Sequence, residues 1–364
     1  MNRSLNQTRT TAPGRRLFLK SAVASAGTCL TYSGLAGQEG ATPSRRESRQ
    51  LMTPAVRRAA ERGLLYLSQR QESARNAGGA FGLDGYRANT AVVSLAGLAF
   101  MSSGSSPNRG PYGNHISACI EYVLANTQSG GFISVSNAQT HGPMYGHGFS
   151  AMFLAEVYGM TGDTEVRDKL KAAIKLIVDS QNAEGGWRYQ PVRQDADISV
   201  SVCQMMALRA ARNAGIYVPN ETVDRCIEYV KRSQNPDGGF TYMLNGGPSA
   251  FPRSAAGVVA LYSAGVYEGD EIRRGLEYLE DNLNQPGTFR GNNHFFYGQY
   301  YAAQAFWHSG GQSWKRYYQM ICDYLIEGQT PQGYWSDFIC PEYGTAMACI
   351  VLQLPNNYLP IFQK

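Results

Sequence analysis

Beyond residue 37, the sequence contains no run of about 20 apolar residues, which is the length that a helix needs to cross a membrane. It also has no surplus of either charge there. The whole chain has 33 basic and 28 acidic residues, and five basic residues but no acidic ones precede residue 38. The remaining 28 basic and 28 acidic residues cancel. We therefore expect no transmembrane span in the mature chain and no electrostatic attraction to nucleic acid.

Cysteine and histidine residues at the spacing of metal ligands are also missing. No C-x-x-C pair occurs, and the six cysteines that follow residue 37 are scattered along the chain. We expect them to be small buried hydrophobic residues. Cys322 and Cys340 flank the last aromatic turn, and the sequence does not decide whether they form a disulfide. The sequence predicts no metal site and no cofactor.

The first 37 residues have the composition of an export signal. Arg15–Lys20 (RRLFLK) matches the twin-arginine pattern, and a weakly apolar stretch follows over Ala22–Ala36. Residues 38–53 are polar and have the composition of a linker. This predicts a twin-arginine signal peptide over residues 1–37, a linker over 38–53, and a periplasmic or otherwise extracytoplasmic protein. The alternative is an arbitrary basic N-terminus.

Short turns that end in an aromatic residue recur roughly every 50 residues, a period typical of stacked helical repeats. These aromatic residues are Phe81, Phe132, Trp187, Phe240, Phe289 and Trp335. An amphipathic segment precedes each turn, and a segment that is apolar nearly all round follows it; such a helix must be buried on every side. The pattern predicts an all-α fold, a single α/α toroid over residues 54–364 with six outer and six inner helices. We expect the apolar tail, Tyr358–Gln363, to pack against the ring.

The turns in SQNAEGGWRYQP, SQNPDGGFTY and GQTPQGYWSD are similar to the Gln-Trp repeats of the terpenoid-cyclase and protein-prenyltransferase α/α toroids. The resemblance covers about Thr53 to Pro355. Within that superfamily, the chain resembles single-domain prenyltransferase/squalene-oxidase repeat proteins and squalene-hopene cyclases. The resemblance implies the toroidal fold and an apolar, isoprenoid-like ligand in a central cavity. It does not identify a reaction, because one fold hosts unrelated chemistries.

In such a ring, the residues near the start of each inner helix surround the central cavity. By the register of the repeats, the candidate substrate-binding residues are Tyr86, Tyr145, Trp187, Phe251, Arg253, Tyr297, Gln299, Tyr300 and Tyr343. A funnel of aromatic side chains suits an apolar ligand, and ring faces can stabilise a carbocation. The alternative is that these aromatic residues only pack the helix ends against one another.

Asp195, Asp197 and His147 are the candidate catalytic residues. Asp195-Ala196-Asp197 resembles part of the Asp-x-Asp-Asp acid motif of squalene-hopene-type cyclases, whose chemistry needs a protonated carboxylic acid in a dry site. Ile198 occupies the fourth position, so the motif is incomplete, and His147 is the candidate for the missing support. The alternative for Asp197 is a helix N-cap, because it directly precedes the apolar segment from Ile198.

Three classes of function stay open, and with them the question of whether the chain is an enzyme. The first is an acid-initiated, terpene-cyclase-like enzyme. The second is a non-catalytic scaffold that binds an isoprenoid, a lipid or a protein. The third is a toroidal polysaccharide lyase or hydrolase, suggested by Arg188, Arg193 and Arg253 near the turns. A zinc protein prenyltransferase is disfavoured, because tyrosine, glutamine and glycine stand where the resemblance would place its zinc ligands.

Overall fold

The computed structural model describes residues 50–283, 285 and 294–363. The predicted signal peptide, most of the predicted linker and the turn at Phe289 lie outside the described residues. The described residues belong to one compact unit. Within its described part every long element is an α-helix, so the predicted all-α toroid is confirmed.

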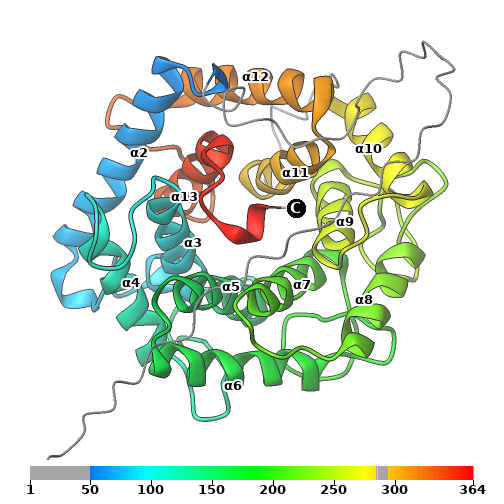
Figure 1. Ribbon diagram of the computed structural model, residues 1–364, viewed down its shortest axis with the longest axis horizontal. Helices are drawn as coiled ribbons and strands as arrows, with labels where there is room; N and C mark the ends of the chain where they lie inside the picture. The colour runs from blue at the N-terminus through cyan, green and yellow to red at the C-terminus, as the bar shows by residue number, and fades with distance from the viewer. Residues whose placement is uncertain (1–49, 284, 286–293, 364) are drawn as a thin grey trace, which may run out of the picture. The chain divides into compact units, whose positions relative to one another are not determined.

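The unit is a closed double ring of helices (Figure 1). The outer helices are α2 (Pro54–Ser73), α4 (Gly113–Ala125), α6 (Thr164–Ser180), α8 (Asn220–Arg232), α10 (Asp270–Leu283) and α12 (Gly311–Gly328). The inner helices are α3 (Thr90–Met101), α5 (Pro143–Thr161), α7 (Ile198–Asn213), α9 (Phe251–Ser263), α11 (Phe295–Ser309) and α13 (Pro341–Gln353). Each inner helix packs against the next, and the ring closes where α13 packs against α3 and α2.

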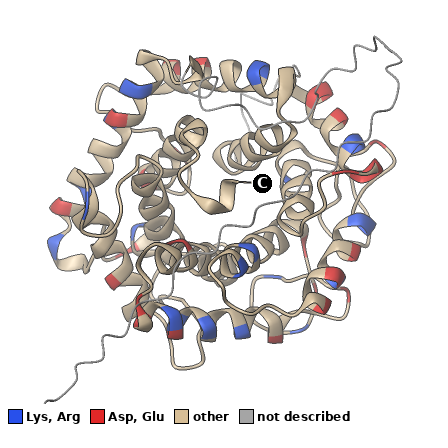
Figure 2. Cartoon of the chain, in the orientation of Figure 1, with Lys and Arg blue, Asp and Glu red and all other residues tan. Residues whose placement is uncertain are grey.

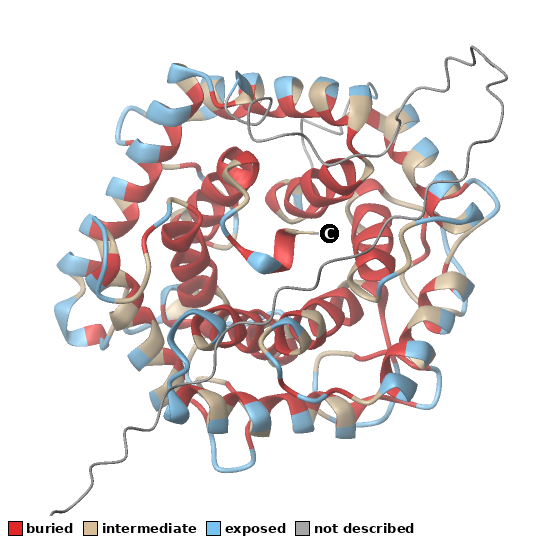
Figure 3. Ribbon diagram, viewed as in Figure 1, coloured by how far each residue is buried: buried red, intermediate tan, exposed pale blue. Residues whose placement is uncertain are grey.

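Composition decides which ring a helix joins. The outer helices bury one apolar stripe and turn their charged residues outward, as Figures 2 and 3 show. Helix α8, for example, buries Val223, Cys226 and Val230 and has charged residues between them. The inner helices are buried nearly all round, and α3 exposes none of its residues. Small residues let them approach closely: a Cβ on Gly97 would lie 2.5 Å from the Phe153 ring of α5.

The recurrent turns fasten each repeat to the next outer helix. In the third repeat the side-chain amide of Gln181 donates to the carbonyls of Gly185 and Thr222, at 2.8 and 2.9 Å. The backbone of Gly185 has a φ of +100°, and a Cβ there would lie 2.1 Å from the Arg225 carbonyl oxygen of α8. Gln234 and Gln329 make the same pair of bonds in their own repeats. The bond from Gln329 reaches α2 and so ties the last repeat to the first.

The second turn differs by one residue from the predicted alignment. Gly131 has the positive φ of +86°, so the residue two positions later packs inward, as Trp187 does after Gly185. That residue is Ile133, which is fully buried, whereas Phe132 is only half-buried. In this turn the inward-packing position is therefore taken by Ile133 and not by the aromatic residue Phe132.

The tail and the cysteines complete the fold. Leu359, Ile361 and Phe362 are buried, and the tail lies inside the inner ring (Figure 1). The six cysteines of the described chain are all free and buried. Cys322 and Cys340 therefore do not form the disulfide that the sequence left undecided. Burial raises the pKa of both thiols to about 12, which keeps them protonated and unreactive. Among the described helices, none is long and apolar enough to cross a membrane.

Candidate ligand pocket

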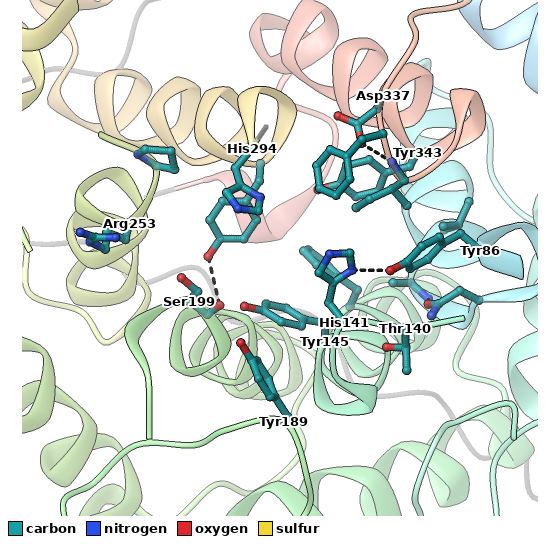
Figure 4. A pocket seen from close by; sticks show the side chains of 18 of the residues that line it. Tyr86, Thr140, His141, Tyr145, Tyr189, Ser199, Arg253, His294, Asp337 and Tyr343 are labelled. Carbon is teal, nitrogen blue, oxygen red and sulfur yellow. Dashed lines mark hydrogen bonds between the residues drawn. The ribbon is translucent and has the colours of Figure 1, made fainter. Parts of the chain in front are cut away.

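The inner helices surround a cavity of about 430 Å³ at their N-terminal ends (Figure 4). Residues from all six repeats line it, because every inner helix points its N-terminus to the same face of the ring. Eight of the 20 lining residues are tyrosine or phenylalanine, and two more are histidine. The cavity is thus an aromatic cup with few charged groups.

Five of the predicted substrate-binding residues line this cavity. They are Tyr86, Tyr145, Arg253, Tyr297 and Tyr343. Burial raises the pKa of the Tyr145, Tyr297 and Tyr343 phenols well above the usual value of 10, so these rings stay neutral. Tyr297 also donates to the backbone carbonyl of Ser199 on α7, at 3.1 Å, which fixes its ring across the helix interface. These residues offer neutral aromatic surface rather than charge.

Four other predicted substrate-binding residues do not line the cavity. The Trp187 indole donates to the Ile177 carbonyl at 2.7 Å, and the Gln299 side chain accepts from Tyr317 at 2.9 Å. Both therefore face the outer ring. Phe251 is buried at the start of α9, and Tyr300 lies one layer below the cavity against Phe149, with ring centroids 6.0 Å apart.

His147 lies between the two rings, away from the cavity. Its Nδ1 accepts from the Ile133 amide at 3.2 Å, so its Nε2 carries the proton and donates to the Ala173 carbonyl at 3.2 Å. In the equivalent position of the third repeat, Ser201 accepts from the Trp187 amide. The imidazole is fully buried, and burial lowers its pKa to about 4. His147 therefore holds a turn in place, and neither of its nitrogens is free to move a proton at a ligand.

The two aspartates also lie outside the cavity wall. Asp195 is half-exposed and pairs with Arg188. Asp197 is fully buried and accepts from the Val200 amide at 2.9 Å, so the predicted N-cap of α7 is confirmed. Burial raises the pKa of Asp197 to about 6, although the Val200 amide and Arg188, 3.9 Å away, oppose the shift. The structure places Asp197 behind the wall, where it cannot touch a ligand.

The cap makes a specific prediction about stability. Asp197→Asn keeps an acceptor for the Val200 amide, so we expect a change in unfolding free energy below about 0.5 kcal/mol. Asp197→Ala leaves that amide without its partner, and we expect a loss of about 1–2 kcal/mol. Chemical denaturation of the two variants at neutral pH measures both values. Equal losses for Asn and Ala would show that the negative charge, rather than the cap, stabilises this helix.

Several lining residues were missed because they precede the inner helices. Tyr189, Tyr242 and Asp337 each stand two positions after a buried turn aromatic, which is Trp187, Phe240 or Trp335. That shared position was the signal that the sequence offered. A search for residues at the starts of the inner helices passes over it.

Asp337 and a group of rings occupy the rim. Asp337 accepts from the Ile339 amide at 2.9 Å, and burial raises its pKa to about 6. Among the described lining residues it is the one carboxylate. The Phe338 ring stands between the imidazoles of His141 and His294, with centroids 5.7 and 5.6 Å away, and His141 is hydrogen-bonded to the Tyr86 hydroxyl. No three His, Cys, Asp or Glu side chains of the described chain converge as a metal site.

Comparison with known proteins finds the same architecture in other proteins. The family model of the squalene-hopene cyclase C-terminal domain matches residues 147–308. A search of curated proteins finds no match. Type II terpene cyclase MstE from Scytonema has a TM-score of 0.56, at 14% identity, over 88% of this chain and 100% of its own. A variant of that cyclase is known in complex with its substrate, geranylgeranyl dihydroxybenzoate. The chain is therefore a toroid that is similar to squalene-hopene cyclases, as its repeats predicted.

Enzymes that act on sugars share the fold. An α-1,6-mannanase of Salegentibacter in complex with α-1,6-mannotriose has a TM-score of 0.56, at 9% identity, over 81% of this chain and 98% of its own. Cellobiose 2-epimerase from Bacillus thermoamylovorans has a TM-score of 0.52, at 12% identity, over 74% of this chain and 86% of its own. At these identities the likenesses show the fold alone, and the pocket has to distinguish the functions.

Proposed function

We propose that this chain binds an isoprenoid, or an apolar ligand of similar shape, in the aromatic cup. The observation that carries the proposal is the lining itself: eight tyrosine and phenylalanine residues drawn from the whole ring, with one carboxylate among them. Neutral rings bury apolar surface and bind without a counter-charge. The volume of about 430 Å³ falls within the usual range of small-molecule sites, about 300–1,000 Å³.

The polar groups at the mouth suit the polar end of such a ligand. Thr140, His141 and Arg253 line the same cavity and carry polar groups, whereas the Asn89 side chain is already bonded to the Ala91 amide and the Gln139 carbonyl. The Scytonema cyclase acts on a substrate of this kind, an isoprenoid chain with a polar aromatic head. If the chain is catalytic, the carboxyl group in position is Asp337, which replaces Asp195 and Asp197 as the candidate acid or base.

Sugar hydrolysis has less support. Most glycoside hydrolases use a pair of carboxyl groups on either side of the scissile bond, roughly 5–9.5 Å apart. In the described wall of this cavity Asp337 has no second carboxylate opposite it. The mannanase-like alternative therefore lacks one of the two groups that its chemistry requires.

Ligand binding tests the proposal directly. We expect geranylgeraniol to bind the purified chain, as measured by quenching of intrinsic fluorescence and by native mass spectrometry. Tyr343→Ala should weaken binding roughly tenfold, because losing a ring contact of about 1.4 kcal/mol corresponds to that factor. Tyr217→Ala, at an 83% exposed site outside the pocket, is the control and should change nothing. Binding of α-1,6-mannotriose without binding of any prenyl alcohol would overturn the proposal.

We also propose that the chain is exported through the twin-arginine route, on the evidence of the RRLFLK motif alone. Replacing Arg15 and Arg16 by lysine should leave the full-length chain in the cytoplasm, since the two arginines identify the signal. Fractionation of the producing cell, with the unaltered chain beside it, measures the change. Normal processing of the double variant would contradict the proposal.

A further inference from the structure

The C-terminal tail is held inside the inner ring by three inner helices. The Trp307 indole of α11 donates to the Phe362 carbonyl at 2.9 Å, and Arg209 of α7 reaches the Gln363 carbonyl at 3.4 Å. Glu156 of α5 accepts from the Ile361 amide at 3.1 Å. These anchors lie in the C-terminal halves of their helices, whereas the pocket lies at the N-terminal ends. The tail therefore fills the half of the ring that the pocket does not use.

A short stack of rings joins the tail to the pocket. Phe149 lines the cavity and meets the Tyr300 ring edge-on, with centroids 6.0 Å apart. The other side of Tyr300 meets the Phe362 ring of the tail, with centroids 6.4 Å apart. Tyr300 is fully buried, and Phe149 and Phe362 are each 3% exposed. The three rings are therefore closed to solvent.

We propose that the stack of Phe149, Tyr300 and Phe362 is the floor of the pocket and sets the longest isoprenoid chain that the protein accepts. This inference rests on the proposed function, and it assigns the tail a role in specificity. A ligand that enters at the N-terminal face extends along the ring axis until it meets Phe149. The ring cannot yield there, because Tyr300 and the anchored tail support it from below.

The proposed floor is tested by measuring how binding affinity depends on the length of the prenyl chain. Dissociation constants are determined for geraniol, farnesol, geranylgeraniol and a hexaprenol. In the unaltered chain, affinity should rise with length and then fall at least about tenfold at the first alcohol that is too long. Tyr300→Ala and Phe362→Ala each remove a buried ring below Phe149 and leave a cavity behind. We expect each to improve binding of that alcohol about tenfold or more, with little change for geraniol.

Phe306→Ala is the matched control. Phe306 is also a buried phenylalanine, but its ring stacks on Tyr317 of the outer helix α12, with centroids 4.7 Å apart, and it does not line the pocket. Its loss should leave the length limit unchanged. If Phe362→Ala fails to fold, Phe362→Val removes less volume and should relax the limit in the same direction.

The outcomes separate the two proposals. If no prenyl alcohol binds the unaltered chain, the proposed function fails. If the alcohols bind but the length limit is the same in the Tyr300 and Phe362 variants, the floor is overturned and the proposed function stands. An equal relaxation in Phe306→Ala would also overturn it, because a general loosening of the ring would then explain the effect.

Discussion

Gly185→Ala is expected to destabilise the toroid by more than about 4 kcal/mol, or to prevent it from folding. Two effects add at this position. The φ of +100° is costly for any residue with a side chain, and the new Cβ would lie 2.1 Å from the Arg225 carbonyl oxygen. A helix backbone cannot yield at that distance, so α8 must move away from the turn. The bonds from Gln181 to Gly185 and Thr222 would then break as well.

Gly215→Ala is the matched control for this prediction. Gly215 also has a positive φ, +82°, but a Cβ there would meet nothing within 4 Å. Alanine should therefore cost only the backbone term, about 1–2 kcal/mol. Guanidinium denaturation of both variants gives the difference that is due to the close approach. Equal losses would show that the turn does not lock α8 and that the repeats are held together by core packing alone.

The fold could be predicted from the sequence because every repeat contains the same two kinds of helix, each of which needs a different amount of cover. A stripe of apolar residues needs one covered face, and an all-round apolar helix needs cover on every side; only alternating outer and inner helices satisfy both. What failed was local register. In the second repeat the aromatic residue, Phe132, follows Gly131 directly, and the backbone conformation of Gly131, which no composition reveals, makes the next residue, Ile133, the buried one.

The pocket was predicted only in part, for a geometric reason. Tyr145, Tyr297 and Tyr343 lie in the first turn of an inner helix on the side that faces the ring axis, and they line the cavity as expected. Gln299 is two residues after Tyr297, about half a helical turn away, so its side chain faces the outer ring instead. The place of a residue in the repeat does not give its angle around the helix. The predicted set therefore contained residues that line the cavity and residues that face the outer ring.

The catalytic candidates show the same limit. A pair of aspartates in the sequence indicates a motif. It does not show which of their oxygens will be hydrogen-bonded to the backbone in the folded chain. Asp197 gives one oxygen to the α7 amides, and His147 gives both nitrogens to backbone groups. Asp337 does not stand out in the sequence, because a single aspartate in a turn is common. It becomes a candidate only when six distant loops meet around one cavity.

Glu156 should make the stability of the toroid fall as the pH rises from 4 to 9. Glu156 is 3% exposed, and burial raises the pKa of its carboxyl group from 4.5 to about 8, although the Ile361 amide opposes the shift. The folded chain therefore binds this proton more tightly than the unfolded chain does. The contribution is fully present below a pH of about 4.5 and is lost as the pH rises through 8. Its size is on the order of 5 kcal/mol, since each tenfold change in proton affinity corresponds to about 1.4 kcal/mol.

Glu156→Gln isolates this contribution from those of His147, Asp197 and Asp337, whose pKa values are also shifted. Glutamine has the shape of the protonated acid and can accept from the Ile361 amide, so both chains should be equally stable near pH 4. The variant should be the more stable one by pH 9, by the same order of 5 kcal/mol. Denaturation curves across that range measure the difference, and parallel curves would show that water reaches Glu156. A chain that ends at Asn357 lacks the segment that covers the carboxyl group. In that background the difference at high pH should shrink severalfold, because an exposed glutamate titrates normally in both states.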